Sequence, residues 1–590
     1  MSSPVNDPRQ PSVAKRYVPS AVPPQDLPVD YSGLIAVVFG IAGVMFRYKL
    51  CSWVAIMFCA QSLVNMKNLE NDLKQISMAM MFAIMGLVTN YFGPARPGTQ
   101  KRSISSKMEK RKLISERKCV EMEHRQPTSS NLERPEQEKA TRVVLVSYPI
   151  QGHVAPFIKL SYLLASRGIK VTLVVTEFLH ARLMASQPEL DGEQCDQVRL
   201  VAVPDGLPEE DPRSDERKVG ESIFKVMPGH LENLLNKANL EGNQVACIIA
   251  DAIFGWALEF AEKKEIKLAM FWPSTPGGLA LALSIPKLIE AGIIDSNGTP
   301  TMKGNKIQLS PDLPPLTDGD LVWSYPGNQI AQKMIFQSLF SIQQNLEKCC
   351  WILCNWFHEL NPLVGDTIPN ILPLGPLLAN GKPAGTFWPE DSTCLSWLDR
   401  QPPRSVVYVA FGSIAKHSQH QIDELALGLE LLGRPFLWVN RSALTSGSSS
   451  KFPDGYEKRI PASHGKIVPW APQEKVLAHP SVACFLSHCG WNSTMDGIST
   501  GVPILCWPNF ADQFYNRSCI CDGYKVGLCL NPDAYGIVTR HEIRRKLENL
   551  IADEGIRGNS MRLKEMAEES LRKGGSSAKN LESFIEHIKQ

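Results

Sequence analysis

Residues 470–513 read WAPQEKVLAHPSVACFLSHCGWNSTMDGISTGVPILCWPNFADQ and give the clearest indication of fold in this chain. The apolar run ACFLS predicts a buried strand, which leads into the tripeptide HCG (488–490). The polar residues in WNSTMDGI (491–498) are of the capping type and predict the start of a helix. A strand that passes through glycine into a helix start presents free backbone N–H groups and a positive dipole end, so this turn is suited to an anion.

Four side chains of the same stretch fit a ligand composed of a base, a diphosphate and a sugar. His488 can donate a hydrogen bond to a phosphate oxygen, and Trp470 offers a flat face on which a nucleobase can stack. Asp512 and Gln513 follow a proline-containing loop and are suited to sugar hydroxyls. Each feature alone is a weak signal, but together they predict a nucleotide-sugar pocket.

Strand–helix alternation also occurs elsewhere in the chain. RVVLVSYP (142–149) is a near-continuous β-branched run, as expected of a parallel strand buried on both faces. The loop IQGHVAP follows, then an amphipathic helix closed by Gly168, and then the strand KVTLVV (170–175). SVVYVAFGS (405–413) opens a second unit of this kind, beyond the proline-rich segment 372–385. We therefore predict an α/β fold with two doubly wound lobes and a cleft between them.

In order and in full length, residues 470–513 resemble the plant secondary-product glycosyltransferase signature of the family 1 UDP-glycosyltransferases. The resemblance covers about 142–590 and implies the GT-B fold, in which two Rossmann-like lobes enclose a UDP-sugar. We expect an acceptor-binding lobe over 141–378, a UDP-sugar-binding lobe over 379–577, and a C-terminal helix, 578–590, that packs back on the acceptor lobe.

The resemblance assigns the nucleoside end of the donor site. It implies that Trp470 stacks on uracil, that Ala471 binds uracil through its backbone and that Gln473 lines the same site. One position departs from the family pattern, because Asp496 stands where the family has the glutamate that binds ribose. The shorter carboxylate would reach the ribose through a water or a small shift, or Asp496 is an ordinary exposed helix residue.

The resemblance also assigns the diphosphate and the sugar. His488, Asn492 and Ser493 would hold the diphosphate, together with the turn that ends at Ser413, which could instead be only a helix N-cap. The resemblance also implies that Trp491 lies near the sugar and that Asp512 and Gln513 bind its hydroxyls. In this family, a glutamine at the position of Gln513 usually indicates a preference for glucose.

The reaction needs a base that takes the proton from an acceptor hydroxyl as the oxygen attacks the anomeric carbon. His153 follows the first strand, at the edge where α/β ligand sites form. A single loop histidine is more often structural, but the resemblance implies that His153 is the base. Asp251 ends the strand VACIIAD and could cap the next helix; the resemblance of DAIFGWALEFA (251–261) implies instead that it orients the imidazole. Displacement from one face would make the transferase inverting.

The acceptor site is less well defined by the sequence. FWPSTPGG (271–278), Phe254 and Trp256 could form aromatic walls for a flavonoid, phenolic or terpenoid aglycone, or could be ordinary core residues. Ser274 lies near a position where the family often places a sugar-contacting hydroxyl, but Pro273 perturbs the local pattern.

Composition excludes several other classes of function. The net charge is only +2, which gives no support for a nucleic-acid partner. The 15 cysteines are dispersed and lack a second pair at metal-ligand spacing, so we expect buried reduced thiols and no zinc site. No aspartate pair with metal-ligand spacing is evident, so we expect no metal and no cofactor, the UDP-sugar being a co-substrate.

The N-terminal residues form a different kind of sequence. Residues 1–30 are a polar, proline-rich flexible arm and residues 97–140 are a charged linker. Between them, 31–96 carry three dense apolar runs, each slightly short of the ~20 residues of a comfortable membrane span. A helix apolar on all sides needs lipid or a large protein around it. We therefore predict three transmembrane helices within 31–93 rather than a soluble bundle.

Residues 1–100 resemble Asterix, a three-span endoplasmic reticulum protein of the PAT intramembrane chaperone complex, which would make PAT subunits partners of this module. Fusion of neighbouring reading frames is the preferred explanation, and a genuine membrane-tethered enzyme is the alternative. The basic run after residue 100 favours a cytosolic C-terminus. The sequon at 492–494 lies in the expected phosphate site, which also favours a cytosolic catalytic part at the endoplasmic reticulum membrane. Without the module the enzyme would be cytosolic.

The sequence leaves three functions open. The first is a UDP-glucosyltransferase of plant secondary metabolism, and the second is a chaperone subunit to which the transferase part is incidental. The third is a catalytically silent sugar-nucleotide-binding protein, suggested by the departure at Asp496. Retention of His153, Asp251, His488 and Gln513 argues against the third.

Overall fold

The computed structural model describes residues 140–191, 197–213, 215–302, 304, 306–415, 417–441 and 452–590, with Ala55, Met57, Cys59, Ser77, Met80 and Met81. The chain divides into two units, Met1–His124 and Arg125–Gln590, and the second of them contains both β-sheets. The predicted arm, membrane module and linker fall almost entirely outside the described residues. Within the described ranges, no helix combines the length and the apolar character needed to cross a membrane.

Seven parallel strands form the sheet of the first lobe, in the order β3-β2-β1-β4-β5-β6-β7. The strands are β1 (Arg142–Val146), β2 (Lys170–Thr176), β3 (Val198–Val203), β4 (Cys247–Asp251), β5 (Lys267–Trp272), β6 (Trp351–Cys354) and β7 (Ile371–Pro373). All five residues of the central strand β4 are buried, because helices cover both faces of the sheet.

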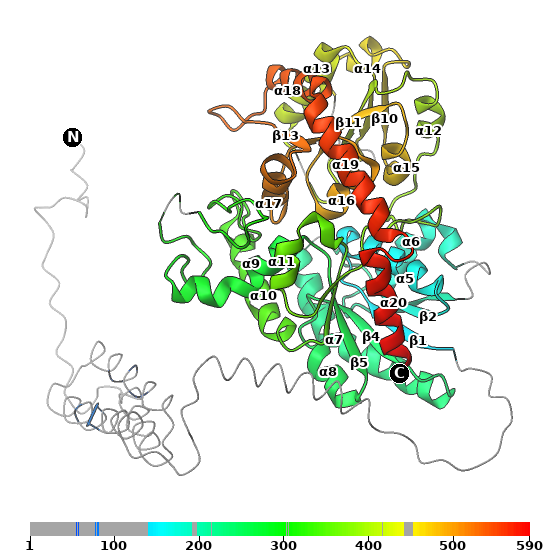
Figure 1. Ribbon diagram of the computed structural model, residues 1–590, viewed down its shortest axis with the longest axis vertical. Helices are drawn as coiled ribbons and strands as arrows, with labels where there is room; N and C mark the ends of the chain where they lie inside the picture. The colour runs from blue at the N-terminus through cyan, green and yellow to red at the C-terminus, as the bar shows by residue number, and fades with distance from the viewer. Residues whose placement is uncertain are drawn as a thin grey trace, which may run out of the picture. The chain divides into compact units, whose positions relative to one another are not determined.

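The helices of this lobe lie in two layers, one on each face of the sheet (Figure 1). They are α5 (Gln151–Ala165), α6 (Glu177–Ser186), η3 (Pro188–Asp191), α7 (Glu216–Leu240), α8 (Ala257–Lys264), α9 (Pro276–Glu290), α10 (Gln329–Leu346), η5 (His358–Leu360) and α11 (Pro362–Thr367). The apolar core on the α7 side continues into the second lobe through Trp491, Met495 and Tyr515, so the two lobes are packed against each other.

The second lobe has a six-stranded parallel sheet in the order β10-β9-β8-β11-β12-β13. Its strands are β8 (Val406–Ala410), β9 (Phe436–Val439), β10 (Gly465–Val468), β11 (Val482–Ser487), β12 (Ile504–Cys506) and β13 (Gly527–Cys529). Its helical segments are α12 (Thr393–Leu398), α13 (Gln419–Leu432), α14 (Tyr456–Arg459), α15 (Gln473–Leu477), α16 (Trp491–Thr500), α17 (Gln513–Ser518), η7 (Cys519–Gly523), α18 (Arg540–Ala552) and α19 (Glu554–Leu571). The predicted pair of parallel α/β sheets is thereby confirmed.

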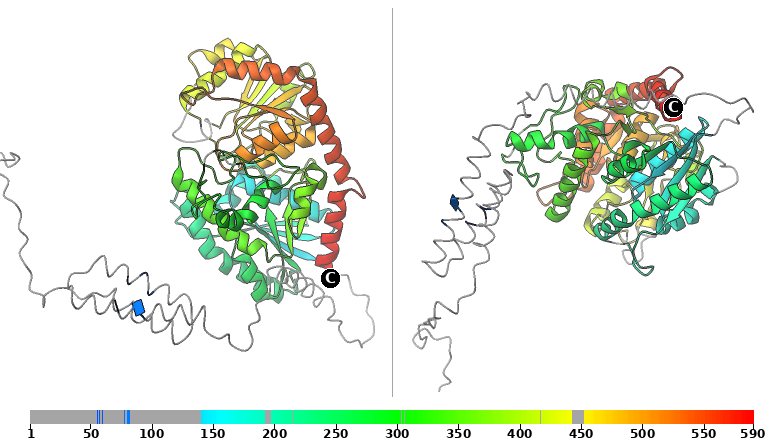
Figure 2. Two further views of the ribbon diagram at one scale, coloured as in Figure 1. Left: turned by 60° about the vertical axis from the view of Figure 1, so that its left-hand side comes forward. Right: turned by 90° about the horizontal axis from the view of Figure 1, so that it is seen from below.

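The last helix, α20 (Ser576–Lys589), follows α19 and returns to the first lobe (Figure 2). Its apolar side joins the core of the first sheet through Leu581, Phe584, Ile585 and Ile588. Asn580 Nδ2 donates to the carbonyl of Pro373 at 3.0 Å, at the end of β7. The exact domain boundaries remain predictions.

One expected element differs from the observed one. The segment IQGHVAP is not a loop: α5 begins at Gln151, so His153 occupies the first turn of a helix. Pro156 lies inside this helix, and its ring nitrogen cannot donate to the carbonyl of Gly152 four residues earlier. That carbonyl instead accepts a hydrogen bond from Asn492 Nδ2 at 2.7 Å, which compensates for the missing helical bond.

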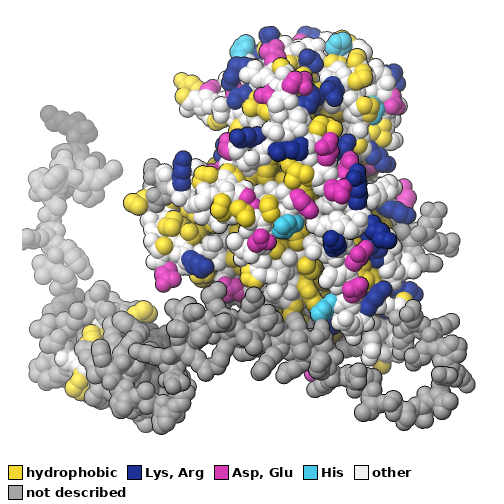
Figure 3. Space-filling model, viewed as in Figure 1, with side chains coloured by type: hydrophobic (Ala, Val, Ile, Leu, Met, Phe, Trp, Pro, Cys, Tyr) yellow, Lys and Arg dark blue, Asp and Glu magenta, His cyan; other side chains and the backbone are white. Residues whose placement is uncertain are grey.

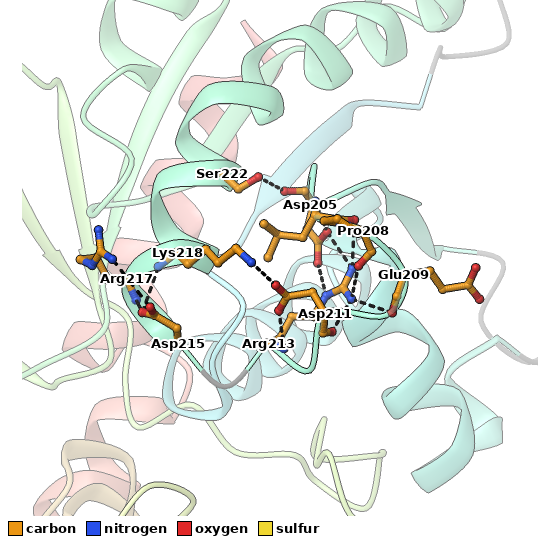
Figure 4. Close-up of polar contacts among 10 residues, drawn as sticks. Asp205, Pro208, Glu209, Asp211, Arg213, Asp215, Arg217, Lys218 and Ser222 are labelled. Carbon is orange, nitrogen blue, oxygen red and sulfur yellow. Dashed lines mark hydrogen bonds and ion pairs between the residues drawn. The ribbon is translucent and has the colours of Figure 1, made fainter.

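A single guanidinium organises the turn between β3 and α7 (Figure 4). Arg213 has a positive φ of 53° and donates to the carboxylate of Asp205 at 3.0 and 3.1 Å. It also donates to the carbonyls of Pro208, Glu209 and Asp211 at 2.7, 3.0 and 2.6 Å. Hydrogen bonds within the loop therefore hold its shape, and none of the loop residues that the structure describes lines the cavity between the lobes.

On the face shown in Figure 3, basic and acidic side chains are interspersed over the second lobe rather than segregated by sign. Such a mixed surface provides no broad positive field for a polyanion, in keeping with the small net charge.

Candidate functional site

A cavity of about 440 Å³ lies between the two lobes, where the carboxyl ends of their strands meet. This is the edge at which open parallel sheets bind ligands. Both lobes contribute to its lining. Of the site residues predicted from the sequence, the lining includes His153, Asp251, Ser274, Ser413, Trp470, Ala471, Gln473, His488, Trp491, Asn492, Ser493, Asp496, Asp512 and Gln513.

A histidine–carboxylate pair lies on the acceptor-lobe side of the cavity. His153 Nδ1 is 2.7 Å from Asp251 Oδ2; the histidine side chain is 18% exposed and the carboxylate is fully buried. The backbone N–H groups of Tyr148 and Ile253 donate to the same carboxylate at 3.3 and 3.2 Å. These contacts fix the carboxylate at the end of β4. Because Nδ1 faces Asp251, Nε2 is the ring nitrogen available to a substrate.

His488 follows β11 and lies between two glycines that leave room for its ring. A Cβ at Gly490 would come within 2.4 Å of His488 Nε2, and a Cβ at Gly412, whose φ is +65°, within 2.5 Å. Burial, and then the positive charge of Arg441, lowers the pKa of His488 to about 4. The imidazole is therefore neutral at physiological pH and can donate one hydrogen bond to an anion without carrying a charge.

Replacing Gly490 with alanine is expected to weaken UDP binding about tenfold or more, because the new methyl group would displace the buried His488 ring. Gly229→Ala is a matched control, since a Cβ at that helical position meets no atom within 4 Å beyond its chain neighbours and the backbone of its own helix. Isothermal titration calorimetry with UDP measures both variants. Equal affinities for Gly490→Ala and Gly229→Ala would show that His488 does not need this space.

Helix α16 begins at the donor side of the cavity, and its first residues contact the acceptor lobe. Trp491 Nε1 donates to the carbonyl of Asn355 at 2.8 Å, and Asn492 Nδ2 donates to the carbonyl of Gly152. The hydroxyl of Ser493 accepts from Gln473 Nε2 at 3.0 Å. The N-terminus of α16 is thus held at the junction of the two lobes, with its backbone N–H groups at the cavity.

The part of the cavity that is predicted to hold the nucleoside contains an indole and a carboxylate. Trp470 lines the cavity, and the ring of Trp388 lies behind it at a centroid distance of 4.7 Å. Asp496 is 6% exposed, and its Oδ2 accepts from Gln473 Nε2 at 2.8 Å. The alternative that Asp496 is an ordinary exposed helix residue is therefore wrong. Burial raises the pKa of Asp496, while Lys159 opposes this shift.

The remaining polar residues gather near the histidine–carboxylate pair. Ser274 Oγ donates to Asp512 Oδ2 at 2.5 Å, so these two candidate residues are brought together. Burial raises the pKa of Asp512. Gln513 Oε1 accepts from the backbone N–H of Asn509 at 2.9 Å, which leaves its amide N–H groups available to a ligand.

Two acceptor candidates lie away from the cavity. Phe254 is fully buried and packs on Tyr148 and Trp256 at centroid distances of 6.0 and 5.4 Å; neither Phe254 nor Trp256 lines the cavity. The sequence cannot distinguish an aromatic core residue after a strand from one that lines a binding site. In this structure Phe254 is a core residue.

The apolar wall of the cavity includes Trp272, which belongs to the segment 271–278 that the sequence offered as an aromatic wall. The rest of the wall was not expected from the sequence and includes Val322, Ile335, Leu339 and Ile342. The last three follow at i, i+4 and i+7 on α10 and so share one face of that helix. This periodicity in 329–346 was the available signal, but it could not show which partner the face would meet.

Among the described residues, no group of three or more histidine, cysteine, aspartate or glutamate side chains is placed to hold a metal ion. Most of the cysteines in the described ranges are buried.

Comparison with known proteins gives two family matches in different parts of the chain. Residues 367–571 match the model described as UDP-glucoronosyl and UDP-glucosyl transferase, and residues 4–99 match the model described as PAT complex subunit Asterix.

Individual relatives extend the first match over both lobes. UDP-glycosyltransferase 83A1 of Arabidopsis thaliana is 42% identical over 463 residues, which cover 76% of this chain and 96% of that protein. Linamarin synthase 1 of Manihot esculenta is 32% identical over 485 residues, covering 76% and 97%. The structure of Phytolacca americana UGT2 complexed with UDP-2fluoro-glucose and pterostilbene matches with a TM-score of 0.66 and 30% identity, covering 76% of this chain and 100% of that one.

Proposed function

The chain belongs to the UDP-glucoronosyl and UDP-glucosyl transferase family and is a UDP-sugar-dependent glycosyltransferase, and we propose that it transfers glucose, with inversion, to a hydroxyl group of a small aglycone. The observation that carries this proposal is the 2.7 Å contact between His153 and Asp251 in a cavity that is also lined by Trp470 and His488. A base, its orienting carboxylate and a nucleotide pocket thus share one cavity.

We assign the proton transfer to His153. The acceptor oxygen attacks C1 of the sugar, the bond from C1 to the diphosphate oxygen breaks, and the acceptor proton passes to His153 Nε2 as UDP departs. Asp251 accepts a hydrogen bond from Nδ1–H, which fixes the tautomer and stabilises the imidazolium that forms. Attack on the face opposite the leaving group converts an α-linked donor into a β-glycoside.

We propose that groups of the donor lobe stabilise the negative charge that develops on UDP as it departs. The backbone N–H groups at the start of α16 and the turn at Ser413 are preorganised donors, and His488 adds a neutral N–H. We also propose that Asn492 and Ser493 bind the diphosphate. The nucleoside is assigned to Trp470, Ala471 and Gln473.

We assign the sugar hydroxyls to Asp512 and Gln513, with Trp491 near the sugar and glucose as the preferred sugar. The amide of Gln513 has its carbonyl oxygen engaged by the backbone and its N–H groups free, which suits a donor to a sugar oxygen. Ser274 acts on the sugar only through Asp512 in this arrangement.

The wall formed by Trp272, Val322 and the α10 face favours an apolar acceptor such as a flavonoid, phenol or terpenoid. The relative solved with pterostilbene holds such a molecule. Phe254 and Trp256 do not line the cavity, so we assign them no contact with the acceptor.

UDP release by the full chain, given UDP-glucose and a panel of flavonols, simple phenols and terpenoid alcohols, tests the proposed function. Turnover that depends on acceptor is expected. A chain that binds UDP but releases none with any acceptor would support the silent sugar-nucleotide-binding protein instead.

Replacing Leu339 with alanine is expected to raise the KM for the best acceptor about fivefold, because roughly 1 kcal/mol of apolar contact is lost. The KM for UDP-glucose should stay unchanged, because Leu339 lies on the acceptor wall. Leu240→Ala, at a residue 90% exposed on α7, is the control. A change in the KM for UDP-glucose alone would place Leu339 outside the acceptor site.

The match of residues 4–99 favours a second proposal for the N-terminal segment. We propose that 31–96 form three transmembrane helices in the endoplasmic reticulum membrane, with PAT complex subunits as partners and the catalytic unit in the cytosol. A peptide spanning 97–140 from the native source would establish that the two parts are one protein, and its consistent absence would favour fused reading frames. Glycosidase sensitivity of Asn492 would contradict the cytosolic placement.

A further inference from the structure

A buried ion cluster joins the two lobes beside the nucleoside end of the cavity. Lys159, on α5 of the acceptor lobe, is 6% exposed and forms ion pairs with Glu474 on α15 and Asp496 on α16. The distance from Lys159 Nζ to Asp496 Oδ1 is 3.4 Å. All three residues line the cavity. Burying the charge of a lysine costs desolvation free energy unless the ammonium group is paired. The pairing of Lys159 with carboxylates of the other lobe therefore calls for an explanation.

The same face of α5 carries the other contact with α16. Gly152, Pro156 and Lys159 are spaced at i, i+4 and i+7 and so lie on one side of the helix. The carbonyl of Gly152 meets Asn492 at one end of this face, and the ammonium group of Lys159 meets Asp496 at the other. The face therefore docks on α16 through two polar contacts.

The oxygens of Asp496 are oriented from opposite sides. Gln473 donates to Oδ2 from the donor lobe, and Lys159 pairs with Oδ1 from the acceptor lobe. Without Lys159, the buried carboxylate of Asp496 and the partly exposed carboxylate of Glu474 would lose the ammonium group that pairs with both of them. The two negative charges would then repel each other.

We propose that Lys159 is a positioning residue for the donor: it keeps Asp496 ionised and oriented so that this short side chain can accept hydrogen bonds from the ribose hydroxyls of the UDP-sugar. This inference rests on the proposed function and on the resemblance by which Asp496 stands where the family has the glutamate that binds ribose. Lys159 acts through Asp496, and ribose recognition is thereby shared by the two lobes.

The test compares the affinities of the full chain for UDP and 2′-deoxy-UDP by isothermal titration calorimetry. In the unmodified chain UDP is expected to bind about tenfold more tightly or better, as for a hydrogen bond to a charged group. Lys159→Met, which keeps most of the length of the side chain but not its charge, should bring the two affinities within about twofold. Its KM for UDP-glucose should rise by more than its kcat falls. Lys159→Arg should restore most of the preference.

Arg517→Met is the matched control. Arg517 on α17 also forms an ion pair across the lobes, with Asp320 at 2.8 Å, but does not line the cavity. It should retain the preference for UDP even if its thermal stability falls as much as that of Lys159→Met.

The inference is overturned if Lys159→Met keeps the full preference, or if both nucleotides weaken equally in Lys159→Met and Arg517→Met. Equal binding of the two nucleotides by the unmodified chain would also overturn it. The proposed function fails separately, if the unmodified chain binds UDP but transfers sugar to no acceptor.

Discussion

Replacing His153 with alanine is expected to lower kcat about a thousandfold, within the range of a lost general base. The acceptor hydroxyl would then have to lose its proton without a group at hydrogen-bond distance. UDP affinity should change by less than about twofold, because His153 contacts Asp251 on the acceptor side and not the nucleoside end of the cavity.

Single-turnover UDP release and calorimetry with UDP separate these two effects. His541→Ala, at an exposed histidine on α18, serves as the control. If His153→Ala retained the kcat of the control, another group would be the base. If it lost UDP binding instead, the role of His153 would lie in the donor site.

The second large effect is expected for Asp251→Asn, which preserves the shape of a fully buried side chain. An amide can present its NH2 group to His153 Nδ1, so the ring would favour the tautomer whose Nε2 carries a hydrogen and cannot take a proton. We expect kcat to fall by about a hundredfold to ten-thousandfold, as for other histidine–aspartate pairs.

The pH dependence of kcat distinguishes this role from a structural one. Loss of the carboxylate should shift the acidic limb of the pH profile, on which the general base loses its proton, whereas a variant that only loosens the fold would scale the profile without moving it. A kcat within threefold of the unmodified chain, at an unchanged melting temperature, would show that the carboxylate has no such role.

The sequence sufficed for the parts of the fold that local patterns specify. The β-branched runs at β1, β2 and β8 predicted parallel strands, and the structure confirms them. The stretch 470–513 predicted β11 and the start of α16. An apolar run followed by glycine and capping residues is typical of a buried strand that leads into a helix.

The prediction of a loop at the start of α5 was wrong for a specific reason. A glycine and a proline within six residues indicate a loop when each is considered alone. The hydrogen bond that Pro156 removes is replaced by one from Asn492, 340 residues away in the chain, and no local pattern contains that donor.

The ion cluster and most of the apolar wall of the cavity were missed for a related reason. Lys159, Glu474 and Asp496 come from three helices of two lobes, so only the tertiary packing brings their charges together. Phe254 shows the converse error: its position after β4 is compatible with a cavity, but its ring packs beneath the strand end.

The central claim is that His153 and Asp251 act as one unit, and the variant carrying both His153→Ala and Asp251→Asn tests it most directly. Groups that act through one another lose activity non-additively. The account predicts that kcat for UDP release by the double variant equals that of His153→Ala within about threefold. A kcat reduced by the product of the two single losses would contradict it, because the two side chains would then contribute independently.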